Sequence, residues 1–175
     1  IKNRGNYIQW VALDDIQKSD STYGRWKEHT QQIVNYAHSR GIRVGMNPLL
    51  FGASSFQNAF VLSSEAKTRE AQKAEIRESV RKLAGEIPLD VLNLSFGEFV
   101  GSEPQEFIDQ VNDAYDAIQE VRPDIDVTAT VHVGNFDNLR VSYNGERQLF
   151  YFLVQYANPR IVPWVHSVMY FNLFD

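Results

Sequence analysis

The chain has 175 residues, of which 43% are apolar and 22% are charged, a composition typical of one globular domain rather than of a disordered segment. Its net charge of −5 and pI near 5.4 argue against a nucleic-acid partner, because phosphate binding needs a concentrated basic face. The sequence has no cysteine, which excludes disulfides, thiol catalysis and cysteine-ligated metals, and it has no apolar run of about 18 residues that would predict a membrane span.

Short apolar runs alternate with longer amphipathic stretches, a pattern typical of parallel strand–helix–strand units. We expect five strands, over residues 7–13, 42–47, 91–96, 127–133 and 165–171. Between them we expect four helices, over residues 24–39, 65–84, 104–121 and 147–156. Ser63 or Ser64 is expected to cap the second helix, and a loop with Asn144-Gly145 to precede the fourth.

The alternation fits either a (β/α) barrel of the TIM type or a doubly wound sheet. A doubly wound nucleotide-binding sheet usually has a glycine-rich first turn, whereas the turn here is Leu13-Asp14-Asp15-Ile16. This favours the barrel. We therefore expect residues 1–175 to form a single α/β domain, an incomplete TIM-type barrel of about five parallel strands with flanking helices, truncated at one or both ends.

Strand side chains alternate between two faces, and in each predicted strand one row is aliphatic while the other is small or polar. Because covering helices need an aliphatic surface, we assign the polar row to the barrel interior. The strand ends then bring a set of polar side chains to the carboxyl-terminal mouth, where barrel enzymes work: Asn47, His132, Asn135, Tyr170 and Asn172. In the alternative interpretation, the Thr and Asn side chains only satisfy one another inside the barrel.

Glu98 follows the third strand and is the candidate general acid, since a carboxyl group held among apolar neighbours can stay protonated near neutral pH. Strict alternation places it on the outer row, so a bulge at Gly97 is needed to turn it into the mouth. A solvent-facing loop residue is the alternative. Asp14 ends the first strand at the same edge and is a candidate substrate ligand or a helix-entry residue.

His132 is a candidate catalytic base or a hydrogen-bonded core residue. We expect His166 to be structural and His29 and His38 to lie on the surface. A metal site would need Asp14, Glu98 and His132 together, and no spacing motif supports one, so we expect no metal and no cofactor.

The segment 51–60 mixes phenylalanines with amide and hydroxyl groups, and Phe56 lies at its centre. Sugars bind to such surfaces because aromatic rings cover their C–H faces while amides take their hydroxyls. Burial of the phenylalanines under a long loop explains the same pattern.

Three segments resemble glycoside hydrolase family 18, the chitinase-like barrels. Residues 6–15 are similar to that family's second strand, the run Gly41-Ile42-Arg43-Val44-Gly45-Met46-Asn47 to its third, and Val168-Met169-Tyr170-Phe171-Asn172 to its sixth, which carries Met-x-Tyr-Asp. The family signature is D-x-x-D-x-D-x-E. When it is aligned on Glu98, Leu94 and Phe96 stand where two aspartates belong.

Together with the polar strand ends, the resemblance predicts a carbohydrate-active enzyme that acts on an oligo- or polysaccharide, with Glu98, Tyr170 and His132 as catalytic residues. Asn47, Asp14, Asn135, Asn172 and Phe56 are the expected substrate-binding residues. The alternatives are a barrel that binds carbohydrate without cleaving it and a metal-assisted hydrolase of another class. A secreted or periplasmic location is the favoured one.

Overall fold

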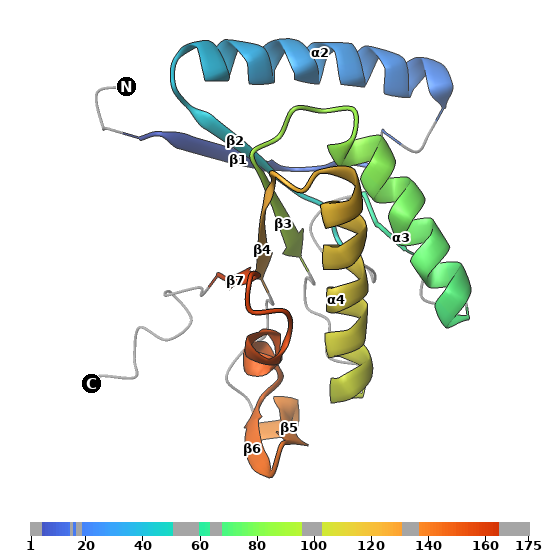
Figure 1. Cartoon of the computed structure of the whole chain (residues 1–175), viewed down its shortest axis with the longest axis vertical. Helices are drawn as coiled ribbons and strands as arrows, with labels where there is room; N and C mark the ends of the chain where they lie inside the picture. The colour runs from blue at the N-terminus through green and yellow to red at the C-terminus, as the bar shows by residue number, and fades with distance from the viewer. Residues whose placement is uncertain are drawn as a thin grey trace.

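The computed structural model describes residues 5–14, 16, 19–50, 60–63, 68–95, 103–130 and 137–164 (Figure 1). A five-stranded parallel sheet is its centre, formed by β1 (Tyr7–Val11), β2 (Arg43–Asn47), β3 (Val91–Ser95), β4 (Asp126–Thr130) and β7 (Val162–Pro163). The strands lie side by side in their order along the chain. The expected α/β class with a parallel sheet is confirmed.

In the described part of the chain, three α-helices follow β1, β2 and β3, and the sequence marks their ends. They are α2 (Asp20–Ser39), α3 (Arg69–Ala84) and α4 (Pro104–Val121). The Ser19 hydroxyl accepts a hydrogen bond from the Thr22 amide at 3.2 Å and so caps α2. Beyond the other end of α2, Gly41 has a φ of +69°, a left-handed conformation in which a side chain is unfavourable. Pro104 opens α4, where its missing N–H costs nothing.

The main core lies between the sheet and these helices. It contains the aliphatic row of the strands, as the alternation predicts, together with helix residues that are almost fully buried: Val44, Met46, Leu92, Leu94, Val127 and Ala129 from the strands, and Val34, Ile76, Val80 and Val111 from the helices. Figure 1 shows α3 and α4 side by side and α2 along β1 and β2. The opposite face of the sheet carries the polar row.

The expected helix over 147–156 begins at Phe150 rather than at Arg147 and is a 3-10 helix. Residues Arg140–Tyr143 (β5) and Glu146–Leu149 (β6) form an antiparallel hairpin, preceded by a 3-10 turn over Asp137–Leu139 and followed by a 3-10 helix over Phe150–Tyr156. The hairpin turns at Asn144 and Gly145, with φ of +51° and +79°. Asn-Gly is a strong signal for a two-residue hairpin loop, because both positions tolerate positive φ.

Several expected boundaries also shift. The cap of α3 is Thr68, whose hydroxyl accepts the Ala71 amide hydrogen bond at 3.4 Å, rather than a serine five residues earlier. The fifth strand is already paired with β4 at Val162, before the expected range 165–171, which lies outside the described residues. Within the described ranges, no helix is long and apolar enough to cross a membrane.

Candidate functional site

The polar face of the sheet is built from the alternate residues of neighbouring strands. In the register, Gly45 lies opposite Gln9, Asn93 opposite Thr128, and Ser95 opposite Thr130. Because β1 to β4 are parallel, the half-buried side chains of Asn47 and Ser95 stand with Thr130 at one edge, the carboxyl-terminal edge of the sheet. Of the polar strand ends predicted to gather, Asn47 lies in the described part of the chain, and it stands at this edge.

Two polar side chains on this face satisfy each other. The Thr130 hydroxyl donates to Oδ1 of Asn93 at 3.2 Å, and both residues are buried. This pair matches the interpretation in which Thr and Asn only compensate one another. Thr128 does not fit it, because it is 6% exposed and its hydroxyl has no hydrogen-bond partner among the described residues. A buried hydroxyl without a partner is costly, so this position favours a polar group in front of it.

An aromatic pair spans the polar face. The rings of Tyr7, in the first strand of the sheet, and Trp164, directly after the last, meet edge to face with their centroids 6.1 Å apart. The Trp164 amide donates to the Ala129 carbonyl at 2.8 Å, which continues the pairing of β7 with β4. Four strand spacings would separate the outer strands of a flat sheet by about 19 Å. The sheet is therefore strongly curled, with its polar face on the concave side.

The curl is combined with a stagger of the strands. Following the register from strand to strand, Tyr7 comes opposite Asn158, which lies six residues before Trp164. The contact therefore runs diagonally to the hydrogen-bonding direction, as it does in a sheet whose strands are tilted about a common axis. Figure 1 shows the same coiling, since β1 runs across the view while β4 runs down it.

Gly45 allows Tyr7 to lie across the concave face. A Cβ atom at this glycine would stand 1.9 Å from the tyrosine hydroxyl, so the ring occupies the space that a side chain would fill. The hydroxyl donates to Oε1 of Gln9 on the same strand. Burial raises the pKa of Tyr7 above its ordinary value, and nearby Asp90 adds to the rise while Arg43 opposes it.

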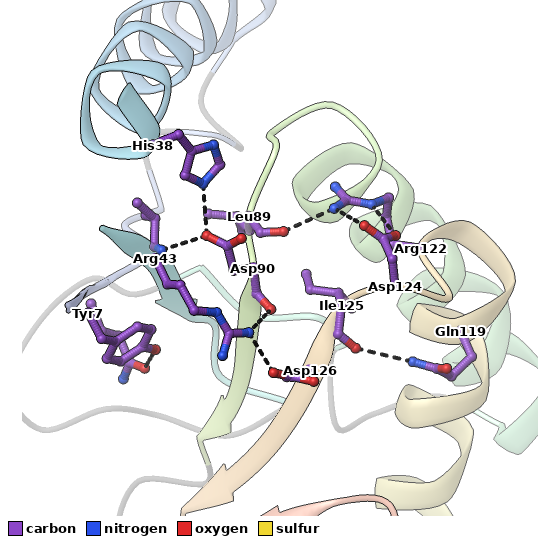
Figure 2. A network of polar contacts seen from close by, with 12 residues as sticks. Tyr7, His38, Arg43, Leu89, Asp90, Gln119, Arg122, Asp124, Ile125 and Asp126 are labelled. Carbon is purple, nitrogen blue, oxygen red and sulfur yellow. Dashed lines mark hydrogen bonds and ion pairs between the residues drawn. The ribbon is translucent and has the colours of Figure 1, made fainter. Parts of the chain in front are cut away.

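The opposite, amino-terminal edge of the sheet is held by a network centred on Asp90 (Figure 2). Its Oδ2 accepts hydrogen bonds from the Val44 amide at 2.7 Å and from Nε2 of His38 at 2.8 Å. Arg43 bridges the Asp90 carbonyl, at 3.4 Å, and the Asp126 carboxylate. His38 is thus a surface residue, as expected, but it also ties α2 to β3.

Arg122 supports the same edge from the end of α4 (Figure 2). Its guanidinium donates to the carbonyls of Leu89 at 3.0 Å and Ala84 at 3.2 Å, while Asp124 pairs with it at 2.8 Å through both carboxylate oxygens. The partners of Arg122 are backbone carbonyls and the Asp124 carboxylate. This edge is structural, which leaves the concave face and the carboxyl-terminal edge as the candidate site.

The structure describes two of the predicted site residues. Asn47 ends β2 at the carboxyl-terminal edge, and Asp14 follows β1 at the same edge, half-buried and engaged by a neighbour. Six predicted residues lie outside the described part of the chain: Phe56, Glu98, His132, Asn135, Tyr170 and Asn172. His166 lies outside it as well, and His29 is exposed on α2, as expected.

Tyr7 and Trp164 were not among the site residues predicted from the sequence. A tyrosine two residues from a glutamine, facing a strand glycine, is a signal for a ring that lies across the sheet, but only the register shows that Tyr7 and Gly45 share a face. Within the described ranges, no three His, Asp or Glu side chains are close enough to hold a metal ion. Leu94, at an aspartate position of the family 18 signature, is buried in the helix-facing core. No protein-family model and no curated protein matches the sequence.

Proposed function

We propose that the chain is part of a (β/α) barrel that acts on carbohydrates, with Glu98 as general acid. The observation that carries the barrel is the contact between Tyr7 and Trp164 across the concave face. An eight-stranded barrel has an interior just wide enough for side chains to fill, so rings from its first and fifth strands, which stand opposite each other, are able to touch. Side chains from alternate strands share one interior layer in this fold.

The strand order supports the same proposal. Each strand of the sheet pairs with the next one along the chain, and the order never reverses. A doubly wound sheet has such a reversal, at which its ligand binds. Consecutive right-handed crossovers place all helices on one face, which leaves the other face as a barrel interior.

The composition of the concave face supports a sugar as ligand. Its carboxyl-terminal edge carries the Asn47 amide and the Ser95 hydroxyl, and Thr128 adds a buried hydroxyl that no group in the described part of the chain satisfies. Amide and hydroxyl groups match the donors and acceptors of a sugar, and aromatic rings match its C–H faces. Glu98 comes three residues after Ser95 in the sequence, beyond the carboxyl end of β3. Its role requires the alternation of the strand to change at Gly97.

A Glu98→Gln variant tests the catalytic role. The substitution keeps the size and hydrogen-bonding ability of the side chain but removes the proton that a general acid supplies, which lowers turnover by about 10²–10⁴-fold. We expect hydrolysis of β-1,4-linked oligosaccharides to fall by that factor while their binding is retained. Glu103→Gln, on the exposed N-cap of α4, is the matched control and should leave turnover within twofold.

A non-catalytic carbohydrate-binding barrel is the second candidate, favoured by Leu94 in the core and Phe96 in the sequence where the family 18 signature has aspartates. It predicts that the unmodified chain binds oligosaccharides but releases no product, and that Glu98→Gln changes neither property. A metal-assisted hydrolase predicts instead that a chelator abolishes turnover.

A further inference from the structure

The hairpin formed by β5 and β6 lies at the carboxyl-terminal edge of the sheet. It follows the carboxyl end of β4 in the chain, and the Tyr143 hydroxyl donates to Oε1 of Gln105 at 2.7 Å, in the first turn of α4. That helix begins at the same edge, because it connects the carboxyl end of β3 with the amino end of β4. Figure 1 shows the hairpin beyond the carboxyl ends of β3 and β4. Binding residues of (β/α) barrels lie in the segments that follow the strands at this edge.

One face of the hairpin packs against the rest of the protein. The rings of Tyr143 and Tyr156 meet edge to face with their centroids 4.9 Å apart, and Nε2 of Gln148 donates to the Tyr156 hydroxyl at 3.1 Å. Val141, on the same face, is partly buried against the main core. A two-stranded hairpin is at best marginally stable alone, so these contacts hold it in place. The hairpin therefore presents its second face in a fixed position.

The second face of the hairpin carries two arginines. In the antiparallel register, Ser142 lies opposite Arg147 and Arg140 lies opposite Leu149, so these four residues alternate with those of the packed face. Leu149, at the base of the hairpin, is buried, whereas Ser142 and Arg147 are exposed. Arg140 and Arg147 are diagonal neighbours across the two strands, a spacing of about 7–8 Å that long side chains can span. Both guanidinium groups can therefore reach one ligand group.

The two arginines differ in their partners. Nε of Arg140 lies 3.3 Å from Oδ1 of Asp137, whose side chain is 91% exposed. An ion pair this exposed to water is weak, so a ligand carboxylate can compete with it. Arg147 forms no ion pair with any residue in the described part of the chain. Exposed arginines on α3, by contrast, pair with carboxylates, as Arg77 and Arg81 do.

We propose that the free face of the hairpin binds the carboxylate of an acidic sugar, with Arg147 as its main ligand and Arg140 beside it. A guanidinium is a planar fork of donors that fits a carboxylate with two parallel hydrogen bonds. The Ser142 hydroxyl, directly opposite Arg147, is able to donate to or accept from a neighbouring sugar hydroxyl. The inference rests on the carbohydrate function proposed above and narrows its substrate class to glycans that contain uronic acids.

A pair of matched probes tests this selection. The hexamer of β-1,4-linked glucose is compared with the hexamer of β-1,4-linked glucuronic acid, which differs in carrying carboxylates at C6, by calorimetry with the whole chain. We expect the acidic probe to bind at least about tenfold more tightly at about 0.15 M salt. At this salt the screening length is about 8 Å, so distant charges of this acidic chain contribute little and direct contact with Arg147 dominates.

Arginine variants assign the preference to the hairpin. Arg147→Ala should weaken binding of the acidic probe by about tenfold or more, the loss expected for a charge-assisted hydrogen bond, and should affect the neutral probe much less. Arg147→Lys keeps the charge but loses the fork, so its affinity for the acidic probe should be intermediate. Arg160→Ala removes another exposed arginine, just before β7 at the amino-terminal edge, and is the matched control with no expected effect on either probe. Circular dichroism checks that the variants are folded.

The outcomes separate this inference from the proposed function. An acidic probe that binds no more tightly than the neutral one would overturn the role of the hairpin, while leaving the carbohydrate function in place. Equal losses of affinity from Arg147→Ala and Arg160→Ala would also overturn it, because the preference would then come from net charge alone. A chain that binds neither probe would overturn the proposed function itself.

Discussion

The Tyr23 hydroxyl lies 2.6 Å from Oε2 of Glu86 and joins the first turn of α2 to the segment that follows α3. Burial raises the pKa of this tyrosine far above its ordinary value, and the hydrogen bond and charge of Glu86 raise it further. The folded protein thus binds the phenolic proton more tightly than the unfolded chain does. This contribution to stability is complete below pH 10 and is lost as the pH rises above 10.

A Tyr23→Phe variant should therefore lack the loss of stability that ionisation of Tyr23 causes above pH 10. At neutral pH we expect a loss of about 1 kcal/mol from the missing hydrogen bond, because Glu86 is partly solvated. Urea unfolding between pH 7 and pH 11 measures both effects, since the variant's midpoint should fall less steeply above pH 10 than the parent's, the remaining fall coming from Tyr7, whose pKa is also raised. Parallel curves for the two proteins above pH 10 would show that Tyr23 does not titrate with unfolding.

The stability of the fold at acid pH depends in part on Glu86. Hydrogen bonds from Lys27 and Tyr23 lower the pKa of this carboxyl below its ordinary value. A depressed carboxyl pKa stabilises the fold above about pH 4.5 and ceases to do so as the pH falls through the folded value. Glu86→Gln should make the fall of the urea midpoint at acid pH less steep, whereas Glu78→Gln, in an exposed pair with Arg81, should not. The same acid limb in both variants would contradict this assignment.

Gly45 and Tyr7 should be energetically coupled. Gly45→Ala places a methyl group where the tyrosine hydroxyl lies, which forces the ring away from Trp164 and costs roughly 1–3 kcal/mol as overpacking does. In a Tyr7→Ala background the same glycine substitution should cost almost nothing, because the space is then empty. A double-mutant cycle from urea unfolding gives the coupling energy. Equal costs in the two backgrounds would place the ring elsewhere.

The curl of the sheet can be tested by cross-linking, since the chain contains no cysteine to interfere. A Tyr7→Cys, Trp164→Cys double variant should be joined within one molecule by a short bismaleimide, because both side chains point into the concave face. Ile8→Cys with Trp164→Cys is the control, since Ile8 alternates to the helix side of β1. Mass spectrometry of peptides identifies the product. Equal yields from both pairs would contradict the curled sheet.

Replacement of Arg122 by lysine should destabilise the fold. Its guanidinium serves three carbonyls, those of Ala84, Ile87 and Leu89, and a lysine ammonium cannot reproduce that fork. We expect Arg122→Lys to lower the free energy of unfolding by about 2 kcal/mol, because buried carbonyls lose their partner. Arg81→Lys, in an exposed pair, should change it by less than about 0.5 kcal/mol. Thermal unfolding of both variants provides the comparison.

The helices and strands could be predicted where one physical signal dominates. The helix over Pro104–Val121 has a proline at its start and a continuous apolar stripe, and its predicted bounds agree with the structure. The segment 147–156 has apolar residues at helical spacing, yet the turn at Asn144-Gly145 directs the chain into a hairpin first. A turn of two residues with positive φ outweighs helical spacing, because it fixes the register of both strands that flank it.

The candidate site was harder to predict for a geometric reason. Asn47 could be assigned to the carboxyl-terminal edge, since strand direction and alternation decide where a strand's last residue points. The contact of Tyr7 with Trp164 joins residues that are far apart in sequence and lie at the two outer strands of the sheet. Its existence depends on the curl and stagger of five strands together. No local pattern in the sequence reports those quantities.

The chain-order pairing of the strands also has a consequence for how the molecule is assembled. Every hydrogen-bonded strand neighbour is supplied by the adjacent strand–helix unit, so no pairing must wait for a distant part of the polypeptide. The entropy cost of closing each loop therefore stays modest. Folding can start at any one unit and extend in either direction while still reaching the final strand pairing. Adding or removing one strand–helix unit at the end of the sheet would leave the hydrogen bonds between the inner strands intact. Gene duplication can therefore lengthen this architecture easily.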